Sequence, residues 1–297
     1  MTQVSIPPQT NVLDSFPRIA IWPNADDPSV IGPSARGSST PGRELHRRTI
    51  SQIVIPARLA STRLPEKLLL RETGKTVLQH TYESARHASL PMGIIVAVDS
   101  ERLQREVESF GGQSCLTDPN LPSGTDRVAA VACQYPETDV FINVQGDEPE
   151  ISGEAIDLVA RLLEENPQAD VATLAAPIRN RERLDDPACV KVVCDHRGRA
   201  LYFSRSTIPH ARSWDDTLLN CDPPAFLQHI GIYGYRREFL RNLANLPDSP
   251  LEQLEKLEQL RFLQAGCEIV VGLVAETTRG IDTWNDYRAF VRRRCGC

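Results

Sequence analysis

Two segments of this chain, 52–56 and 93–99, consist mostly of apolar residues that do not alternate with polar ones. A β-strand of this kind has no face suited to water, so both of its faces must be covered. Helical patterns over residues 77–89 and 101–110 follow the two strands in turn. This succession predicts an α/β protein with three layers, in which helices cover a mostly parallel mixed sheet.

The alternation continues along the chain and changes character near residue 188. Before that point we expect helices over 126–133 and 153–165 and strands over 140–144 and 171–177. Beyond it, two short apolar runs flank the turn 195–198, which is typical of an antiparallel hairpin. We therefore expect a small β element within residues 188–245, at the periphery of the main sheet, with strands over 190–193, 200–203 and 229–235.

A long helix is expected over residues 250–264. Its leucines recur every three residues. Because one helical turn takes 3.6 residues, this spacing shifts each leucine around the helix and does not keep all of them on one face. Such a helix should be covered on more than one side. The sequence then predicts a last strand over 268–275 and a closing helix that ends near residue 294.

The first 48 residues differ in composition from the rest of the chain. They hold seven of the 22 prolines and show no sustained helical or strand period. We expect this arm to be disordered. It could be a tail that binds a partner, or it could result from a gene start placed too early. The remaining residues, 49–297, are expected to form a single domain.

The charge of the chain argues against a nucleic-acid partner. The formal net charge is -6 and the sequence pI is about 5.6, so no general positive field is available to hold a polyanion. A basic pocket can still exist locally. No apolar run is long enough to span a bilayer and no signal peptide is evident, so we expect a soluble, cytoplasmic protein without a membrane span.

The eight cysteines contain no C-x-x-C pair and show no regular spacing. They are expected to be reduced thiols, as in a cytoplasmic protein. The terminal Cys295-Gly296-Cys297 could bind a metal or respond to redox conditions, or it could be a frayed end of the chain.

The segment from Ile53 to Lys67 leads from an apolar strand into a loop of small residues that carries Arg58, Arg63 and Lys67. Strand ends in α/β sheets open onto the binding crevice. Small side chains let backbone N–H groups approach phosphate oxygens, and the basic side chains add charge-assisted hydrogen bonds. The pattern predicts a triphosphate site; the alternative is a solvated basic loop after a core strand.

Two aspartates each follow a predicted strand. A carboxylate beside a triphosphate requires a divalent cation between them, so Asp147 is a candidate Mg²⁺ ligand and Asp282 a candidate second ligand. Either acid could instead cap the helix that follows it. A further polar segment, 121–127, precedes a helix whose N–H groups could hold a base or a phosphate, which makes Ser123, Gly124 and Arg127 candidates for the nucleotide site.

Together these segments resemble the 3-deoxy-manno-octulosonate cytidylyltransferases, also called CMP-Kdo synthetases. The similarity runs from about Ile50 to Tyr287. It is carried by Pro56-Ala57-Arg58 through Lys67, Ser123 through Arg127, Asn143 through Pro149, Val190 through Val193, Tyr202 through Pro209, His229 through Arg236, Leu257 through Arg261, and Ile281-Asp282-Thr283.

The resemblance implies that the enzyme transfers CMP from CTP to the anomeric hydroxyl of Kdo, releasing pyrophosphate, for lipopolysaccharide synthesis. It implies Mg²⁺ as cofactor, CTP and a keto sugar acid as substrates, and a homodimer with residues 188–245 near the interface. The implied catalytic set is Arg58, Lys67, Asp147 and Asp282, the last two as metal ligands. The implied nucleotide contacts are Ala57, Arg58, Lys67, Ser123, Gly124 and Gln145, to which Arg63 and Arg127 are added by position; the implied sugar contacts are Arg205, His229, Tyr233, Glu258 and Gln259.

Three alternatives stay open on the sequence. They are a cytidylyltransferase for another sugar acid such as sialic acid, a sugar-1-phosphate nucleotidyltransferase, and an inactive nucleotide-binding module. The chain also departs from the family in one loop, where Glu66 stands in place of a usual glycine and Leu68 in place of a usual proline. If the glycine position needs a positive φ, Glu66 should strain the loop.

Overall fold

A nine-stranded sheet forms the centre of the molecule. The computed structural model describes residues 49–61, 63–277 and 279–296, so the predicted N-terminal arm, 1–48, and the last residue of the Cys-Gly-Cys end lie outside the described residues. The strands are β1 Ser51–Ala57, β2 Ile94–Val98, β3 Gln113–Leu116, β4 Val140–Asn143, β5 Val171–Pro177, β6 Lys191–Cys194, β7 Ala200–Ser204, β8 Leu227–Arg236 and β9 Ile269–Leu273.

The helices are α1 Val77–Ala85, α2 Glu101–Ser109, α3 Gly124–Ala132, α4 Gly153–Glu165, α5 Arg181–Asp185, α6 Arg237–Asn242, α7 Pro250–Glu255, α8 Gln259–Gln264 and α9 Trp284–Cys295. Short 3-10 turns occupy Lys67–Leu69, Asp216–Leu219 and Leu243–Asn245. No helix within the described ranges has the length and apolar character needed to cross a membrane.

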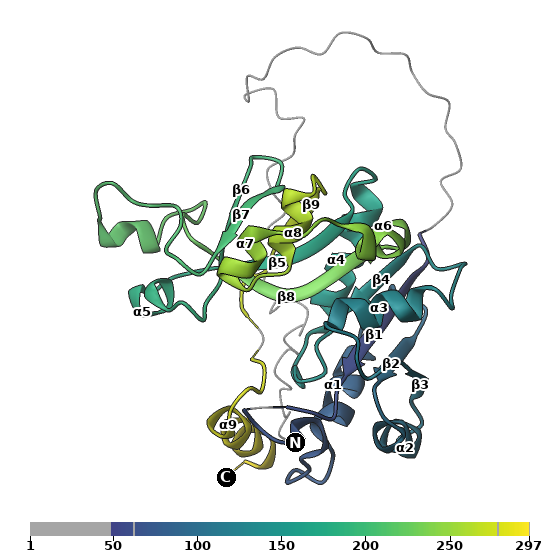
Figure 1. Cartoon of the computed structure of the whole chain (residues 1–297). Helices are drawn as coiled ribbons and strands as arrows, with labels where there is room; N and C mark the ends of the chain where they lie inside the picture. Colours follow the sequence, from purple (N-terminus) through teal and green to yellow (C-terminus); the bar gives the residue numbers. More distant parts are fainter. Residues whose placement is uncertain (1–48, 62, 278, 297) are drawn as a thin grey trace, which may run out of the picture.

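The sheet is mixed and mostly parallel, as the sequence predicts. Its order is β3-β2-β1-β4-β8-β5-β9, and β8 alone in this row runs antiparallel to its neighbours. The hairpin β6–β7 pairs with the start of β8 and projects from one side of the sheet (Figure 1).

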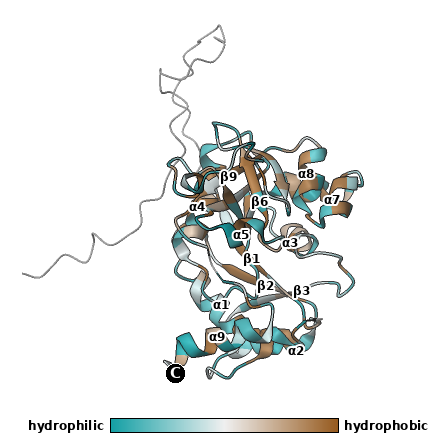
Figure 2. Ribbon diagram, turned by 90° about the vertical axis from the view of Figure 1, so that its left-hand side faces the viewer, coloured by the Kyte–Doolittle hydropathy of each residue, from teal (hydrophilic) through white to brown (hydrophobic). Residues whose placement is uncertain are grey.

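Helices cover both faces of the sheet, and alternate residues of β1 enter opposite cores. Ile53 and Ile55 pack with α1, α2, α4 and α9, whereas Val54 packs with α3, α6 and α8. The apolar strands are therefore enclosed, and polar residues remain on the outer helix faces (Figure 2). This arrangement confirms the predicted three-layer α/β class.

One expectation about the strand over 229–235 was wrong. That strand is part of β8, which lies between β4 and β5 in the middle of the sheet and is not peripheral. Gly234 permits this position, because a Cβ atom there would lie 2.6 Å from Val159 Cγ1 on α4. Only the hairpin β6–β7 occupies the periphery.

The single helix expected over 250–264 was also wrong, because the chain breaks at Lys256, which has φ 53°. A regular helix over 250–264 could not place all five of its evenly spaced leucines on one face. With the chain broken at Lys256, Leu257 and Leu260 are buried, while Leu254 on α7 is left 80% exposed.

Candidate active site

The loops that follow β1 and β4 emerge at the same edge of the sheet, because the two strands are parallel neighbours. The loop after β4 lies close against the end of β1: a Cβ atom on Gly146 would stand 2.9 Å from the carbonyl oxygen of Pro56. Two hydroxyl groups of α1 form hydrogen bonds with this loop. Thr81 donates to the Gly146 carbonyl at 2.9 Å, and Ser84 donates to the Pro149 carbonyl at 2.7 Å.

The segment before α9 brings a second acid to this edge. The backbone N–H of Ile281 donates to the carbonyl of Asp147 at 2.8 Å, which places Asp282 beside Asp147 although 135 residues separate them in the chain. The capping box of Thr283 and Asp286 then starts α9 directly after Asp282. The predicted convergence of the two aspartates is thus present in the structure.

Lys67 lies between the two carboxylates. Its Nζ donates to Asp147 Oδ2, to Asp282 Oδ1 at 3.2 Å and to the Ile281 carbonyl at 3.1 Å. Burial alone would lower the pKa of Lys67, but the two carboxylates outweigh it and the pKa is raised. The ammonium therefore stays charged and links the loop after β1 to both acids.

The two arginines of the same loop lie on either side of this cluster. Arg63 forms an ion pair with Asp282 at 3.0 Å, and Arg58 donates to the carbonyl of Pro122 at 3.1 Å. Ala57 is the buried last residue of β1. The positive side chains predicted to hold a triphosphate are thus arranged along one loop, next to the start of α3.

The start of α3 is a tightly organised turn. Ser123 and Asp126 form a capping box, and a Cβ atom on Gly124 would meet the ring of Pro56 at 3.6 Å. Arg127 is fully buried and donates to Thr117 Oγ1 at 2.7 Å and to the carbonyls of Asp118 and Pro119. Arg127 therefore braces the loop before α3 from inside and does not line an open surface.

A cavity of about 420 Å³ adjoins the acids. Asp147 and Asp282 line it on one side, and Gln145, His229 and Gly231 line it as well. It joins the predicted metal ligands to one predicted sugar contact, His229, and to one predicted nucleotide contact, Gln145, whose Nε2 donates to the Gly231 carbonyl at 3.5 Å.

Two other predicted sugar contacts, Tyr233 and Glu258, are linked to His229 through a series of side-chain contacts. The ring of Tyr233 is 5.3 Å from that of His229 and stacks at 5.7 Å on Tyr235. Tyr235 OH lies 3.2 Å from Thr125 Oγ1, which donates to Glu258 Oε2 at 2.5 Å. Burial raises the pKa of Glu258.

Arg205 and Gln259 are placed apart from the cavity. The guanidinium of Arg205 donates to the carbonyls of Glu255 at 2.7 Å and Pro187 at 3.1 Å, so it ties the break between α7 and α8 to the segment before β6. Gln259 is 4% exposed at the start of α8. Neither residue lines the cavity beside Asp147 and Asp282.

Comparisons with known proteins identify the family of this chain. A family model described as cytidylyltransferase matches residues 52–269. The 3-deoxy-manno-octulosonate cytidylyltransferase of Rhodopirellula baltica is 55% identical over 242 residues, which are 81% of this chain and 97% of that protein. The enzyme of the same name from Hahella chejuensis is 46% identical and covers 79% of this chain and 93% of its own length. This chain belongs to the 3-deoxy-manno-octulosonate cytidylyltransferase family.

Solved structures support the family assignment. A CMP:2-keto-3-deoxy-manno-octonic acid synthetase complexed with CTP has a TM-score of 0.77 at 40% identity and covers 84% of this chain and 99% of its own. A cytidylyltransferase from Leptospira borgpetersenii, 16% identical with a TM-score of 0.54, covers 82% of this chain and 85% of its own and shares the fold alone. The resemblance predicted from the motifs is confirmed.

Glu66 occupies the loop position at which the resemblance predicts a glycine. Glu66 adopts φ 49°, the left-handed region in which a glycine carries no penalty. The strain expected at this position is therefore present. The carboxylate of Glu66 pairs with Arg102 at the start of α2.

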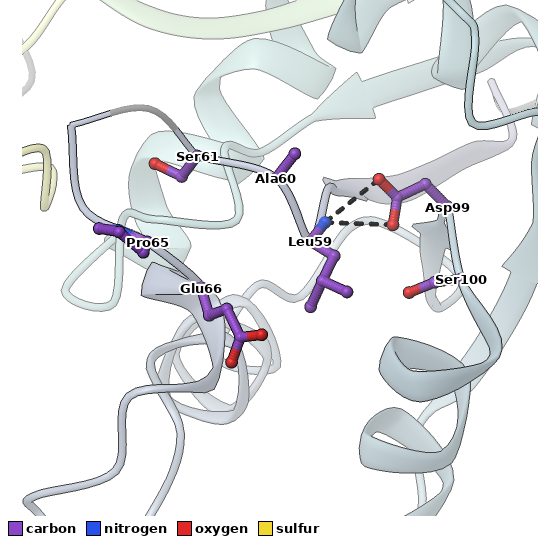
Figure 3. A pocket seen from close by; sticks show the side chains of 7 residues that line it. All are labelled: Leu59, Ala60, Ser61, Pro65, Glu66, Asp99 and Ser100. Carbon is purple, nitrogen blue, oxygen red and sulfur yellow. Dashed lines mark hydrogen bonds between the residues drawn. The ribbon is translucent and has the colours of Figure 1, made fainter.

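A second cavity, of about 520 Å³, lies between this loop and the end of β2. Glu66 lines it from the loop, and Asp99 and Ser100 line it from β2 and the start of α2 (Figure 3). Both carboxylate oxygens of Asp99 accept from the N–H of Leu59 at 3.1 Å. Asp99 and Arg102 were absent from the predicted set, because nothing in their local sequence marks them as neighbours of the phosphate loop.

Proposed function

We propose that this protein transfers CMP from CTP to the anomeric hydroxyl of 3-deoxy-manno-octulosonate, releasing pyrophosphate. The arrangement that carries the proposal is the ammonium of Lys67 holding Asp147 and Asp282 at the edge of a cavity that reaches His229. The similarity to enzymes of this name over about four fifths of the chain supports the same reaction.

The reaction requires no covalent bond between the protein and its substrates. The sugar hydroxyl loses its proton to solvent and its oxygen forms a bond to the α-phosphorus of CTP. The bond from that phosphorus to the bridging oxygen of the β-phosphate breaks as pyrophosphate leaves. Arg58, Arg63 and Lys67 are suited to hold the phosphates and to neutralise the charge that grows on the leaving group. Against the opposing effect of burial, the carboxylates of Asp147 and Asp282 raise the pKa of Lys67, which favours the charged ammonium in the free protein.

We also propose that Asp147 and Asp282 hold Mg²⁺. Both offer the carboxylate oxygens that this ion prefers, and a single cationic group, the ammonium of Lys67, already contacts both. In the described part of the chain no cluster of three or more histidine, cysteine, aspartate or glutamate side chains is placed to bind a metal, so water and phosphate would complete the coordination. When bound, the ion would neutralise phosphate charge.

The proposed enzyme acts as a homodimer in the cytoplasm. Leu201 on β7 is 61% exposed and Trp214, between β7 and β8, is 38% exposed. Exposed apolar side chains within residues 188–245 support an interface there. The seven described cysteines are all free thiols, as a reducing compartment would keep them. Light scattering of wild type and Leu201→Lys tests the dimer: the proposal requires a mass near 66 kDa for the wild type, twice the 33.0 kDa of one chain.

The reaction is tested by pyrophosphate release from CTP with a panel of acceptors, with and without Mg²⁺. The panel contains 3-deoxy-manno-octulosonate, sialic acid and a sugar 1-phosphate. Release with the eight-carbon acid alone supports the proposal. Preference for sialic acid or for the sugar phosphate would replace it by one of the alternative transferases, and no release with any acceptor would favour a nucleotide-binding module.

A further inference from the structure

The strand that carries His229 is irregular where it meets the cavity. In the antiparallel pair of β5 and β8, Thr173 lies opposite Tyr233, but the next residue, Leu174, lies opposite Ile230. Two residues of β8, Gly231 and Ile232, therefore have no partner on β5. Bulges of this kind often re-aim side chains beside active sites.

Thr173 fills this bulge. It is completely buried, and its Oγ1 lies 3.1 Å from the carbonyl of Ile230, 2.8 Å from the carbonyl of Ile232 and 3.0 Å from Nε2 of His229. It is a polar residue within an otherwise apolar strand, Val171–Pro177. Its hydroxyl is thus the point at which the irregular part of β8 is joined to β5.

The hydrogen bonds of the Thr173 hydroxyl determine which tautomer the imidazole of His229 adopts. A threonine hydroxyl has one proton to donate and lone pairs that accept. A carbonyl oxygen can only accept, so the proton of Thr173 goes to Ile232 or Ile230. Were the proton given to His229 instead, both carbonyls would face an oxygen lone pair. The close contact to Nε2 is therefore an Nε2–H donating to Thr173.

We propose that Thr173 is a positioning residue that holds His229 as its Nε2-protonated tautomer, so that Nδ1 serves as a hydrogen-bond acceptor for a hydroxyl of the sugar acid. This inference rests on the proposed function. Among the described residues Nδ1 has no hydrogen-bond partner, and His229 lines the cavity with Asp147 and Asp282. Burial lowers the pKa of His229 to about 3, so the ring is neutral at neutral pH.

A neutral acceptor such as Nδ1 of His229 favours a ligand group that can donate a hydrogen bond. It pairs with a hydroxyl group, which can donate, and not with a carboxylate, which can only accept at neutral pH. The rings of Phe203, at 5.0 Å edge-on, and Tyr233, at 5.3 Å, flank the imidazole. His229 is thereby suited to recognise the hydroxyl-bearing part of the sugar acid.

The test compares wild type with Thr173→Val, which keeps the shape and loses the hydroxyl, and Thr173→Ser, which keeps the hydroxyl. Nitrogen-15 NMR of the histidines at pH 7.5 should give an Nε2–H signal for His229 in wild type and Thr173→Ser, and a mixed or Nδ1–H signal in Thr173→Val. The KM for the sugar acid should rise about tenfold in Thr173→Val, the effect of one lost hydrogen bond, with the KM for CTP unchanged.

An Nδ1–H signal for His229 in the wild type would overturn the proposal. So would equal rises of both KM values in Thr173→Val, since these would indicate a general packing defect. The NMR measurement needs no substrate, so it tests the effect of Thr173 on the His229 tautomer whether or not the enzyme uses the sugar acid. A wild type that does not use the sugar acid would refute the proposed function and leave the tautomer result standing. If Thr173→Val does not fold, the tautomer of His229 in the wild type and the KM of Thr173→Ser for the sugar acid still test the proposal. An Nε2–H signal and a wild-type KM are expected.

Discussion

Glu66 and Arg102 form a two-pronged ion pair, with Nη1 to Oε1 at 2.5 Å and Nη2 to Oε2 at 2.8 Å. The pair joins the phosphate loop, one residue before Lys67, to the first turn of α2. Glu66 reaches it from a left-handed backbone conformation, φ 49°. A negative charge that would oppose a triphosphate is thereby balanced on the side of the loop facing α2.

Removing Arg102 should expose that charge. We expect Arg102→Gln to raise the KM for CTP several-fold, because the carboxylate of Glu66 then acts unbalanced near the nucleotide phosphates. The double variant Glu66→Gly with Arg102→Gln should restore the wild-type KM. Steady-state kinetics at 50 mM and 500 mM salt provide the measurement, and the effect should shrink at the higher salt because exposed charges are screened.

Arg105→Gln is the matched control for Arg102, because Arg105 lies on the same helix and, among the described residues, forms an ion pair with its helix neighbour Glu101. Its KM for CTP should stay at the wild-type value. Glu66→Gly alone should raise the melting temperature, since glycine adopts this φ freely. A KM for CTP that does not respond to Arg102→Gln would mean that the charge of Glu66 does not reach the nucleotide.

Lys67 and Asp147 should be essential for turnover. We expect Lys67→Met and Asp147→Asn each to reduce kcat/KM for CTP at least about a hundredfold, because each removes a charge set against the reacting phosphates. Asp248→Asn, at an exposed position that does not line the cavity beside Asp147, should keep full activity. Near-normal turnover of Asp147→Asn with CTP and Mg²⁺ would contradict the proposed role of the acid.

His229 should make the protein less stable in mild acid. Its pKa is lowered by burial to about 3, whereas an unfolded histidine titrates near 6.5. As the pH falls from about 6.5 toward 3, the unfolded chain therefore binds a proton that the folded protein does not, and stability declines by up to about 1.4 kcal/mol per pH unit.

The measurement for this effect is the urea midpoint of wild type and His229→Gln between pH 4.5 and 7.5. The variant should lose part of the acid slope and behave like wild type in its slope above pH 7. Some slope should remain, because burial and Arg294 also lower the pKa of His80. Identical slopes for the two proteins would show that the folded His229 is protonated like the unfolded one.

Two glycines of β8 should respond differently to alanine. A Cβ atom on Gly234 would lie 2.6 Å from Val159 Cγ1 and 3.1 Å from Leu163 Cδ1, so Gly234→Ala should destabilise the protein by about 1–3 kcal/mol. A Cβ atom added to Gly231 would meet no atom within 4 Å, so Gly231→Ala should change stability by less than about 0.5 kcal/mol. Thermal and urea unfolding compare the two, and equal losses would contradict the tight packing of β8 on α4.

Local features of the sequence were sufficient for the layer architecture and for much of the site. Apolar strands without alternation require cover on both faces, and this physical need predicted the sheet and its helices. The polar loops after β1 and β4 were recognisable because parallel strand ends share one edge of a sheet. Lys67, Asp147 and Asp282 could therefore be proposed as a group, and the structure brings them together.

Other features depend on contacts between distant segments. The antiparallel β8 in mid-sheet, the break at Lys256 and the pairing of Glu66 with Arg102 arise from packing and charge that no local window contains. Thr173 acquires its role only because the irregular part of β8 brings His229, 56 residues further along the chain, to its hydroxyl. Periodicity determined which segments become strands and helices; tertiary packing decided which side chains meet, because hydrogen bonds and ion pairs act only over a few ångströms.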